Sequence, residues 1–268
     1  MSVDSTIRDH QAWLGYLQPD GLVVSPAALV DAQVILDRNC LPLQRDFLDY
    51  IDILEHRGED VYAIPDLAVF LTGFLQWPSD LLVGMASEPP IPESLKVAIL
   101  GGETLEPTFA LKNPRAGEDE SEWLLLVKDL PIETDLDARI TADERSWSAS
   151  PSQRLERLLR ETQVPVGVIS NGRSIRMIHA PRGENSGTLT FPVAAMTEVA
   201  GRPILAALHM LLDEYRLFTA PDEALLTGIL KKSRDFQSSV STELARQVLG
   251  ALYELLRGFQ AADEHTRS

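Results

Sequence analysis

Residues 150–177 read SPSQRLERLLRETQVPVGVISNGRSIRM, and the first half of this stretch has the signals of a complete helix. Ser150 and Gln153 form a Ser-x-x-Gln capping box, and Pro151 suits the first helical position. Leucines then recur at helical spacing until the chain reaches Pro165, which cannot continue a helix. A helix is therefore predicted from residue 151 to about residue 163.

The second half of the stretch has the signals of a β-hairpin. Residues 166–170 and 174–178 are rich in β-branched and apolar side chains, and they flank Asn171 and Gly172. Asn-Gly is the pair best suited to the two positive φ angles of a type I′ turn. The helix is therefore expected to lead directly into a tight two-stranded hairpin.

Further segments with strand signals lie on both sides of this helix and hairpin, between residues 93 and 192. Short apolar or alternating segments separated by glycines and polar stretches predict strands. The expected strands are 94–100, 106–111, 123–128, 165–170, 174–180 and 188–192. The predicted fold is therefore α/β, with a mixed central sheet.

Helical periodicity dominates on both sides of these strands. Residues 6–17, 65–77, 204–218 and 224–236 each suggest a helix, and residues 26–54 suggest two. The chain is accordingly divided into an acidic helical part (1–92), an α/β core (93–200) and a helical connector (201–268).

A long last helix is expected from about residue 239 to residue 262. Apolar side chains step along it by threes and fours, at Val240, Leu244, Val248, Leu252, Leu255, Leu256 and Phe259. Such a broad stripe needs a covering surface, either in this chain or in a partner subunit.

Charge is distributed unevenly. The net charge is −16, and residues 1–145 hold 27 acidic against 10 basic residues, or −17, whereas residues 146–268 hold 13 against 14, or +1. A DNA contact is therefore expected to use arginines of the second half, namely Arg173, Arg176, Arg182 and Arg202. The alternative interpretation of these arginines is a solvated strand face.

The sequence suggests a cytoplasmic protein. No apolar run approaches the roughly 18 residues of a membrane span, and the first residues do not have the pattern of a signal peptide. Cys40 is the single cysteine, which excludes an internal disulfide and points to core packing.

Nuclease chemistry of the PD-(D/E)xK type places one acid at a strand end and an acid-x-lysine on the next strand, so that carboxylates hold a divalent metal. The predicted strands 106–111 and 123–128 have the right order. None of the five lysines, however, follows an acid by two residues. Glu106 and Asp129 remain as displaced carboxylates that are either a weak site or a solvated strand end.

Other chemical motifs are missing from the sequence. The five histidines show no metal-ligand spacing, and neither Gly-Lys-Ser/Thr nor Gly-x-Ser-x-Gly occurs. The amino-methyltransferase tetrapeptides Asn-Pro-Pro-Tyr and Asp-Pro-Pro-Tyr are also absent. No metal or cofactor is therefore expected, with Mg²⁺ reserved for the case of an active nuclease.

Several segments together resemble one protein family. The likeness lies in EPTFAL (106–111), WLLLV (123–127), TDLD (134–137), SPSQRLERLLRET (150–162), VPVGVISNG (164–172) and LGALYELLRGFQAAD (249–263). In this order they resemble the N-terminal region of large adenine-specific DNA methyltransferases, the type IIG restriction-modification enzymes and their relatives in DISARM-type phage defence. The likeness covers roughly residues 90–263.

The resemblance implies a PD-(D/E)xK nuclease fold, followed by a helical connector and a methyltransferase domain. The sequence departs from this pattern because Thr108 replaces the expected aspartate and Val127-Lys128-Asp129 replaces Glu-x-Lys. No methyltransferase follows the last helix, so an excised domain, a split subunit or a truncated product is expected.

Three functions follow as hypotheses. The first is a catalytically silent nuclease-like domain of a phage-defence methyltransferase system, which binds or positions DNA and docks partner subunits through its C-terminal helix. The second is an active Mg²⁺-dependent endonuclease using Glu106, Asp129 and the helix-borne Asp66. The third is a protein-interaction adaptor that does not contact DNA.

Overall fold

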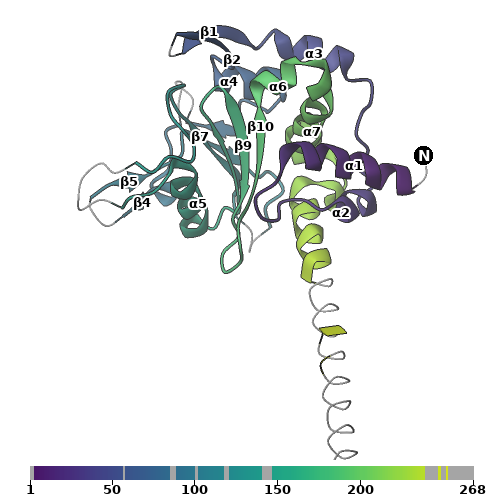
Figure 1. Cartoon of the computed structure of the whole chain (residues 1–268). Helices are drawn as coiled ribbons and strands as arrows, with labels where there is room; N and C mark the ends of the chain where they lie inside the picture. The colour runs from purple at the N-terminus through teal and green to yellow at the C-terminus, as the bar shows by residue number, and fades with distance from the viewer. Residues whose placement is uncertain are drawn as a thin grey trace, which may run out of the picture.

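The computed structural model describes residues 3–56, 58–84, 89–99, 102–117, 121–140, 147–238, 247–248 and 252. These residues form a mixed α/β fold around a six-stranded sheet (Figure 1). The strand order is β10-β9-β8-β7-β6-β3, with bounds β3 (Leu82–Val83), β6 (Phe109–Lys112), β7 (Trp123–Asp129), β8 (Val166–Ser170), β9 (Ser174–His179) and β10 (Gly187–Pro192).

The sheet is mixed because one strand pair is parallel. Strand β7 pairs with β8 in parallel, with Leu126 opposite Gly167, and the other neighbouring strands of the sheet are antiparallel. A parallel pair requires a crossover, which helix α5 (Pro151–Thr162) supplies. The prediction of an α/β fold with a mixed central sheet is therefore confirmed.

The remaining helices lie mainly around the other face of the sheet and its edges (Figure 1). They are α1 (Val3–Leu17), α2 (Pro26–Asp31), α3 (Cys40–Leu48), α4 (Leu67–Val69), α6 (Val193–Thr197) and α7 (Arg202–Leu212). Helix α4 continues into a π-helical turn, η1 (Phe70–Phe74), and a second π-helical turn, η4 (Tyr215–Thr219), follows α7. Single 3₁₀ turns lie at η2 (Glu93–Leu95), η3 (Val199–Gly201) and η5 (Asp222–Ala224), and residues 226–238 are helical.

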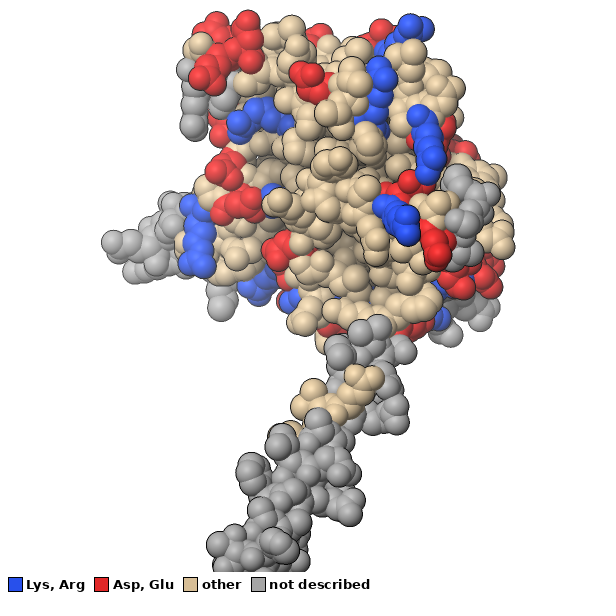
Figure 2. All heavy atoms as spheres, turned by 45° about the vertical axis from the view of Figure 1, so that its right-hand side comes forward, with Lys and Arg blue, Asp and Glu red and all other residues tan. Residues whose placement is uncertain are grey.

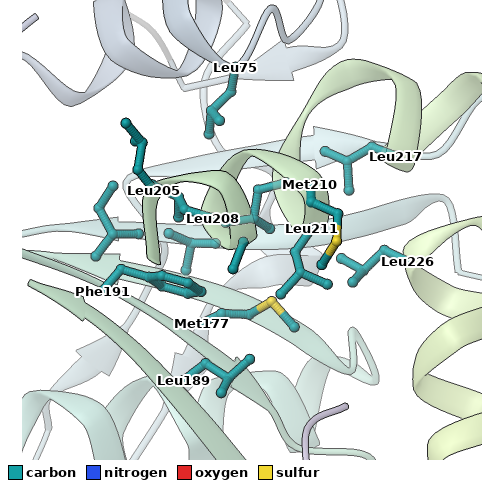
Figure 3. Packing of buried hydrophobic residues seen from close by; sticks show 14 of the residues in the cluster. Leu75, Met177, Leu189, Phe191, Leu205, Leu208, Met210, Leu211, Leu217 and Leu226 are labelled. Atoms are coloured by element: carbon teal, nitrogen blue, oxygen red, sulfur yellow. The ribbon is translucent and has the colours of Figure 1, made fainter. Parts of the chain in front are cut away.

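Two buried clusters sandwich the sheet, because successive strand residues point to opposite faces. In β8, Val168 belongs to the cluster covered by α1 and α7, whereas Ile169 belongs to the cluster covered by α5. Figure 3 shows the first cluster, in which side chains of β9 and β10 lie against those of α7: Met177, Leu189, Phe191, Leu205, Leu208 and Leu211. Because both faces of the sheet are covered, the sequences of the central strands are continuous apolar runs.

Helix α5 begins and ends where its sequence signals predict. The Ser150 hydroxyl accepts a hydrogen bond from the Gln153 N–H, and the Gln153 side chain accepts one from the Ser150 N–H, which completes the capping box. Gln163 ends the helix in the left-handed conformation, with φ of 59°. The hydrophobic face then packs Leu155 and Leu158 against the sheet.

The hairpin turn lies where it was predicted, but its type differs. Ser170 pairs with Ile175, so residues 171–174 connect the paired ends of β8 and β9, although Ser174 already pairs with Pro192 of β10. Gly172 has a φ of 77°, whereas Asn171 does not have a positive φ. The Asn171 side chain is the reason, because its Oδ1 accepts the N–H groups of Arg173 and Ser174. These local bonds replace the two-residue type I′ turn.

The N-terminal part contains a hairpin that the helical interpretation missed. Helix α3 ends at Leu48, and β1 (Asp52–His56) pairs antiparallel with β2 (Glu59–Ala63) in a separate two-stranded sheet. The apolar residues up to Leu54 fit a helical period, which is why a helix was predicted here. A hairpin forms instead because Gly58 adopts the positive φ of 82° that a tight turn needs and because the flanking residues include β-branched side chains.

The strand predicted at 94–100 is not part of the central sheet. Within it, Val97–Ala98 (β4) pairs, among the described strands, with β5 (Thr104–Leu105) alone, and the two form a small separate sheet. The edge position beside β6 is taken by β3, from the part predicted to be helical. Packing also crosses both predicted boundaries, since Trp13, Val168 and Leu208 share one buried cluster.

Most of the predicted C-terminal helix lies outside the described residues. Two residues of its apolar stripe, Val248 and Leu252, are described. Both are helical, and their side chains are 57% and 51% exposed, respectively. No helix among the described residues is both long and apolar enough to cross a bilayer.

Candidate functional site

The two predicted nuclease strands lie side by side, so the residues at their ends meet. Strand β6 starts just after Thr108, and β7 ends at Asp129 in the antiparallel neighbour. The Thr108 hydroxyl accepts the Asp129 N–H at 3.0 Å, and the Thr108 N–H donates to the Val127 carbonyl at 2.7 Å. A hydroxyl that bonds to backbone thus stands at the position where an aspartate was expected.

Lys128 lies next to Glu106 on the side of the sheet covered by α5. Its ammonium donates to the Glu106 carbonyl oxygen at 2.9 Å. Burial lowers the pKa of Lys128, while the negative charges of Glu106 and Asp129 act in the opposite direction. The Glu106 carboxylate is half-exposed and lies 3.9 Å from the ammonium of Lys96.

Asp129 points to the other face of the sheet, because it follows Lys128 directly in the strand. Burial raises the pKa of Asp129, and the nearby negative charge of Asp66 raises it further. Asp66 itself caps α4, where its Oδ1 accepts the Val69 N–H at 3.0 Å. The structure therefore brings Asp66 and Asp129 together and leaves Glu106 with the two lysines.

Among the residues that the structure describes, no group of three or more His, Cys, Asp and Glu side chains is placed to hold a metal ion.

A pocket of about 250 Å³ opens beside this strand end, between α5 and the β4–β5 hairpin. Its walls are mainly apolar, and its charged side chains are those of Glu103, Glu106, Lys128 and Arg154. Arg154 donates to Glu103 and to the carbonyl oxygens of Ala149 and Trp147. The arginine thereby ties the β4–β5 hairpin to the start of α5.

Sequence reasoning missed Glu103 and Arg154 as neighbours. They are separated by 51 positions, and no spacing rule relates them. Only the folding of the β4–β5 hairpin over α5 brings them together.

Of the predicted DNA-binding arginines, Arg176 is fully engaged within the fold. Its guanidinium donates to both carboxylate oxygens of Asp137, at 2.5 and 2.8 Å, and to the hydroxyls of Ser152 and Thr190. The side chain is only 13% exposed. This fork-shaped pairing joins β9 and β10 to the segment that precedes α5.

The other arginines lie at separate places. Arg173 lies in the turn before β9 and Arg182 in the loop after it, so they flank opposite ends of the strand. Arg182 is exposed, whereas the Nε of Arg173 is buried, with no partner among the described residues. Arg202 begins α7 and donates to the Gln44 side chain.

Basic side chains do not form one continuous surface on the face that Figure 2 draws. Lysines and arginines are separated there by uncharged surface and by acidic side chains (Figure 2). The loop after β9 offers a local alternative, because Pro181, Lys231 and Arg234 line one pocket of about 380 Å³ next to Arg182. Arg234 pairs with Glu184 at 2.8 Å, and Lys231 is exposed.

No protein-family model, curated protein or solved structure matches this chain.

Proposed function

We propose that this chain is a catalytically silent domain of the PD-(D/E)xK nuclease type, from a methyltransferase-based phage-defence system. In this proposal it binds or positions DNA through the second half of the chain. Its C-terminal helix docks a methyltransferase or another subunit of the system. The family assignment rests on the sequence resemblance described above.

The observation that carries the proposal is the hydrogen bond from the Asp129 N–H to the Thr108 hydroxyl. Nuclease chemistry of this type needs an acid at the start of one strand, directly beside an acid-x-lysine on the next. Strands β6 and β7 supply that juxtaposition, but a threonine and Val127 occupy the ligand positions. The geometry therefore supports a nuclease-like framework without its metal ligands.

The positions of the arginines change which residues we propose to contact DNA. Arg176 is held by Asp137 and supports the fold, so it is not available to a phosphate group. Arg182 and Lys231 are exposed and lie at the same end of β9. These two residues are proposed to contact the DNA backbone, with Arg173 at the far end of the strand.

A DNA-binding experiment tests this proposal on the full chain. A fluorescent duplex is titrated with the protein, and anisotropy is measured at several salt concentrations. The dissociation constant is expected to rise with salt, because each phosphate contact releases a counterion. In a plot of the logarithm of the dissociation constant against the logarithm of the salt concentration, Arg182→Gln and Lys231→Gln should each reduce the steepness by about one unit.

Arg45→Gln is the matched control, because it removes an exposed positive charge from the acidic first half. It is expected to leave the slope unchanged. Equal effects of all three variants would contradict a contact at the loop after β9.

Cleavage is tested with supercoiled plasmid and Mg²⁺ or Mn²⁺. The proposal expects no nicking above a buffer control. Nicking that Glu106→Ala or Asp129→Ala abolishes would instead establish the alternative, an active metal-dependent endonuclease.

A protein-interaction adaptor is the second candidate, and the charge distribution favours it. The first 145 residues carry a net charge of −17, which repels a phosphate backbone. Failure of the duplex to bind at low salt would select this function over the first.

A further inference from the structure

The β1–β2 hairpin stands apart from the six-stranded sheet. Its two strands pair only with each other among the described strands, and Figure 1 places it at one end of the molecule, next to α3 and α4. The hairpin is anchored at its base, where Ala63 and Ile64 are buried and the Ile64 N–H donates to the Gly172 carbonyl. Towards the turn, the described side chains are exposed or half-exposed.

One face of the hairpin carries an exposed apolar pair. Ile53 lies directly opposite Tyr62 in the antiparallel register, and these side chains are 60% and 40% exposed. Cross-strand neighbours of this kind normally stabilise a sheet by excluding water. A two-stranded hairpin without further support is only marginally stable in water.

The same face carries two opposed carboxylates. Glu55 lies opposite Asp60, two residues along from the Ile53–Tyr62 pair, so all four side chains point to the same side. Like charges directly opposite each other destabilise a strand pair. Neither carboxylate forms an ion pair with a described residue, whereas many acids elsewhere do.

The outer edge of β1 is also open. Apart from those that pair β1 with β2, no backbone hydrogen bond within the described part of the chain involves residues 52–56. An edge strand with unpaired N–H and C=O groups is a template for a further strand. The acidic side chains gathered at the upper left of Figure 2 belong to this end of the molecule.

We propose that the β1 edge binds an extended basic segment of a partner protein, which adds to the hairpin as a third strand. The partner supplies a lysine or arginine to the Glu55–Asp60 pair and an aliphatic side chain to Ile53 and Tyr62. Main-chain hydrogen bonds give such a strand its affinity, and alternate side chains give its specificity. This interface is independent of DNA binding and of the C-terminal helix.

Charge decides between the possible occupants. Residues 49–60 contain five acids and one arginine, so DNA and a second copy of this hairpin would both place negative charge against negative charge. A basic segment is the occupant that relieves the repulsion between Glu55 and Asp60.

The residues of β1 specify a probe peptide. A strand beside Asp52-Ile-Leu-Glu55 is complementary when it places lysine opposite each acid and valine opposite Ile53 and Leu54. The core Lys-Val-Val-Lys satisfies this in both strand directions. Peptides with Glu-Val-Val-Glu and Lys-Ser-Ser-Lys cores test the charge and the apolar contacts separately.

The experiment titrates the full chain into fluorescent forms of these three peptides and measures anisotropy. Saturable binding is expected for Lys-Val-Val-Lys, with weaker binding of the serine peptide and none of the glutamate peptide. The double variant Glu55→Gln/Asp60→Asn should weaken binding about tenfold, because it removes the charge pair without changing shape. Ile53→Ser tests the apolar contact in the same way.

Asp80→Asn/Glu198→Gln is the matched control, since it removes two exposed negative charges elsewhere. Circular dichroism confirms that each variant is folded. The proposal is overturned if the three peptides bind alike or if the control weakens binding as much as the hairpin variant. It is also overturned if the chain self-associates through the hairpin, seen as a dimer in sedimentation that Ile53→Ser dissociates.

Discussion

At the scale of single residues, the ionisation of His179 is strongly coupled to the fold. It is 6% exposed at the end of β9, and its Nδ1 lies 3.5 Å from the guanidinium of Arg234. Burial, together with the positive charge of Arg234, lowers the pKa of His179 to about 4. The folded state therefore favours the neutral imidazole.

This coupling predicts a pH dependence of stability. The unfolded chain binds a proton at His179 near pH 6.5 and the folded chain only near pH 4, so acidification favours unfolding within that window. Between pH 7 and pH 5, His179 should lower the free energy of unfolding by about 2 kcal/mol. Urea melts of the wild type and of His179→Gln at both pH values measure the difference. Equal pH dependence in both proteins would refute the prediction.

At the scale of elements, helix α5 carries a favourable cap at one end and a strained one at the other. The capping box of Ser150 and Gln153 satisfies N–H groups at its start. At its end, Gln163 adopts the left-handed conformation that glycine adopts without a steric cost. The helix connects β7 to β8, so its stability affects the central sheet directly.

Opposite effects are therefore expected from changes at the two ends of α5. Ser150→Ala should lower the free energy of unfolding by about 1 kcal/mol, because an N–H group loses its partner. Gln163→Gly should raise it by about 0.5 to 1 kcal/mol, because the left-handed φ of 59° no longer strains a side chain. Chemical denaturation of the two variants and of the wild type provides the measurement. The same sign for both variants would contradict this account of the helix ends.

At the scale of the whole molecule, the charge is segregated along the chain, and large apolar side chains are exposed at several places among the described residues. Two of these places are the β1–β2 hairpin and the C-terminal region with Val248 and Leu252. Burying a large apolar side chain against a partner contributes about 1.5 to 3 kcal/mol before the costs of association are subtracted. The exposed C-terminal side chains are therefore consistent with a docking helix.

Leu252→Asp tests the docking role of this helix. The variant is expected to keep the thermal midpoint of the wild type, because Leu252 is 51% exposed and contributes little to the core. It should reduce self-association, or docking to a partner subunit, as measured by light scattering after size exclusion. Unfolding of the variant would instead show that Leu252 is an ordinary core residue.

Local sequence signals were sufficient for the elements whose stability is local. The boundaries of α5 depend on side chains within one turn of each end, and the position of the 171–174 turn depends on Asn171 and Gly172. The β-branched and apolar residues on either side of Asn171 and Gly172 likewise predicted the pairing of β8 with β9. For these elements, the sequence alone determined the position of the helix and of the hairpin, although the predicted type I′ turn was wrong.

Tertiary packing decided the features that depend on distant residues. Strand β3, from the part predicted to be helical, takes the edge of the sheet because Leu82 pairs with Leu111, and β4 is left to a separate sheet. Arg176 is withdrawn from solvent by Asp137, which is 39 positions away. The pleat of β7 directs Lys128, which bonds to Glu106, and Asp129 to opposite faces of the sheet. Periodicity reports how a segment buries its own side chains, whereas these outcomes depend on which distant segment lies beside it.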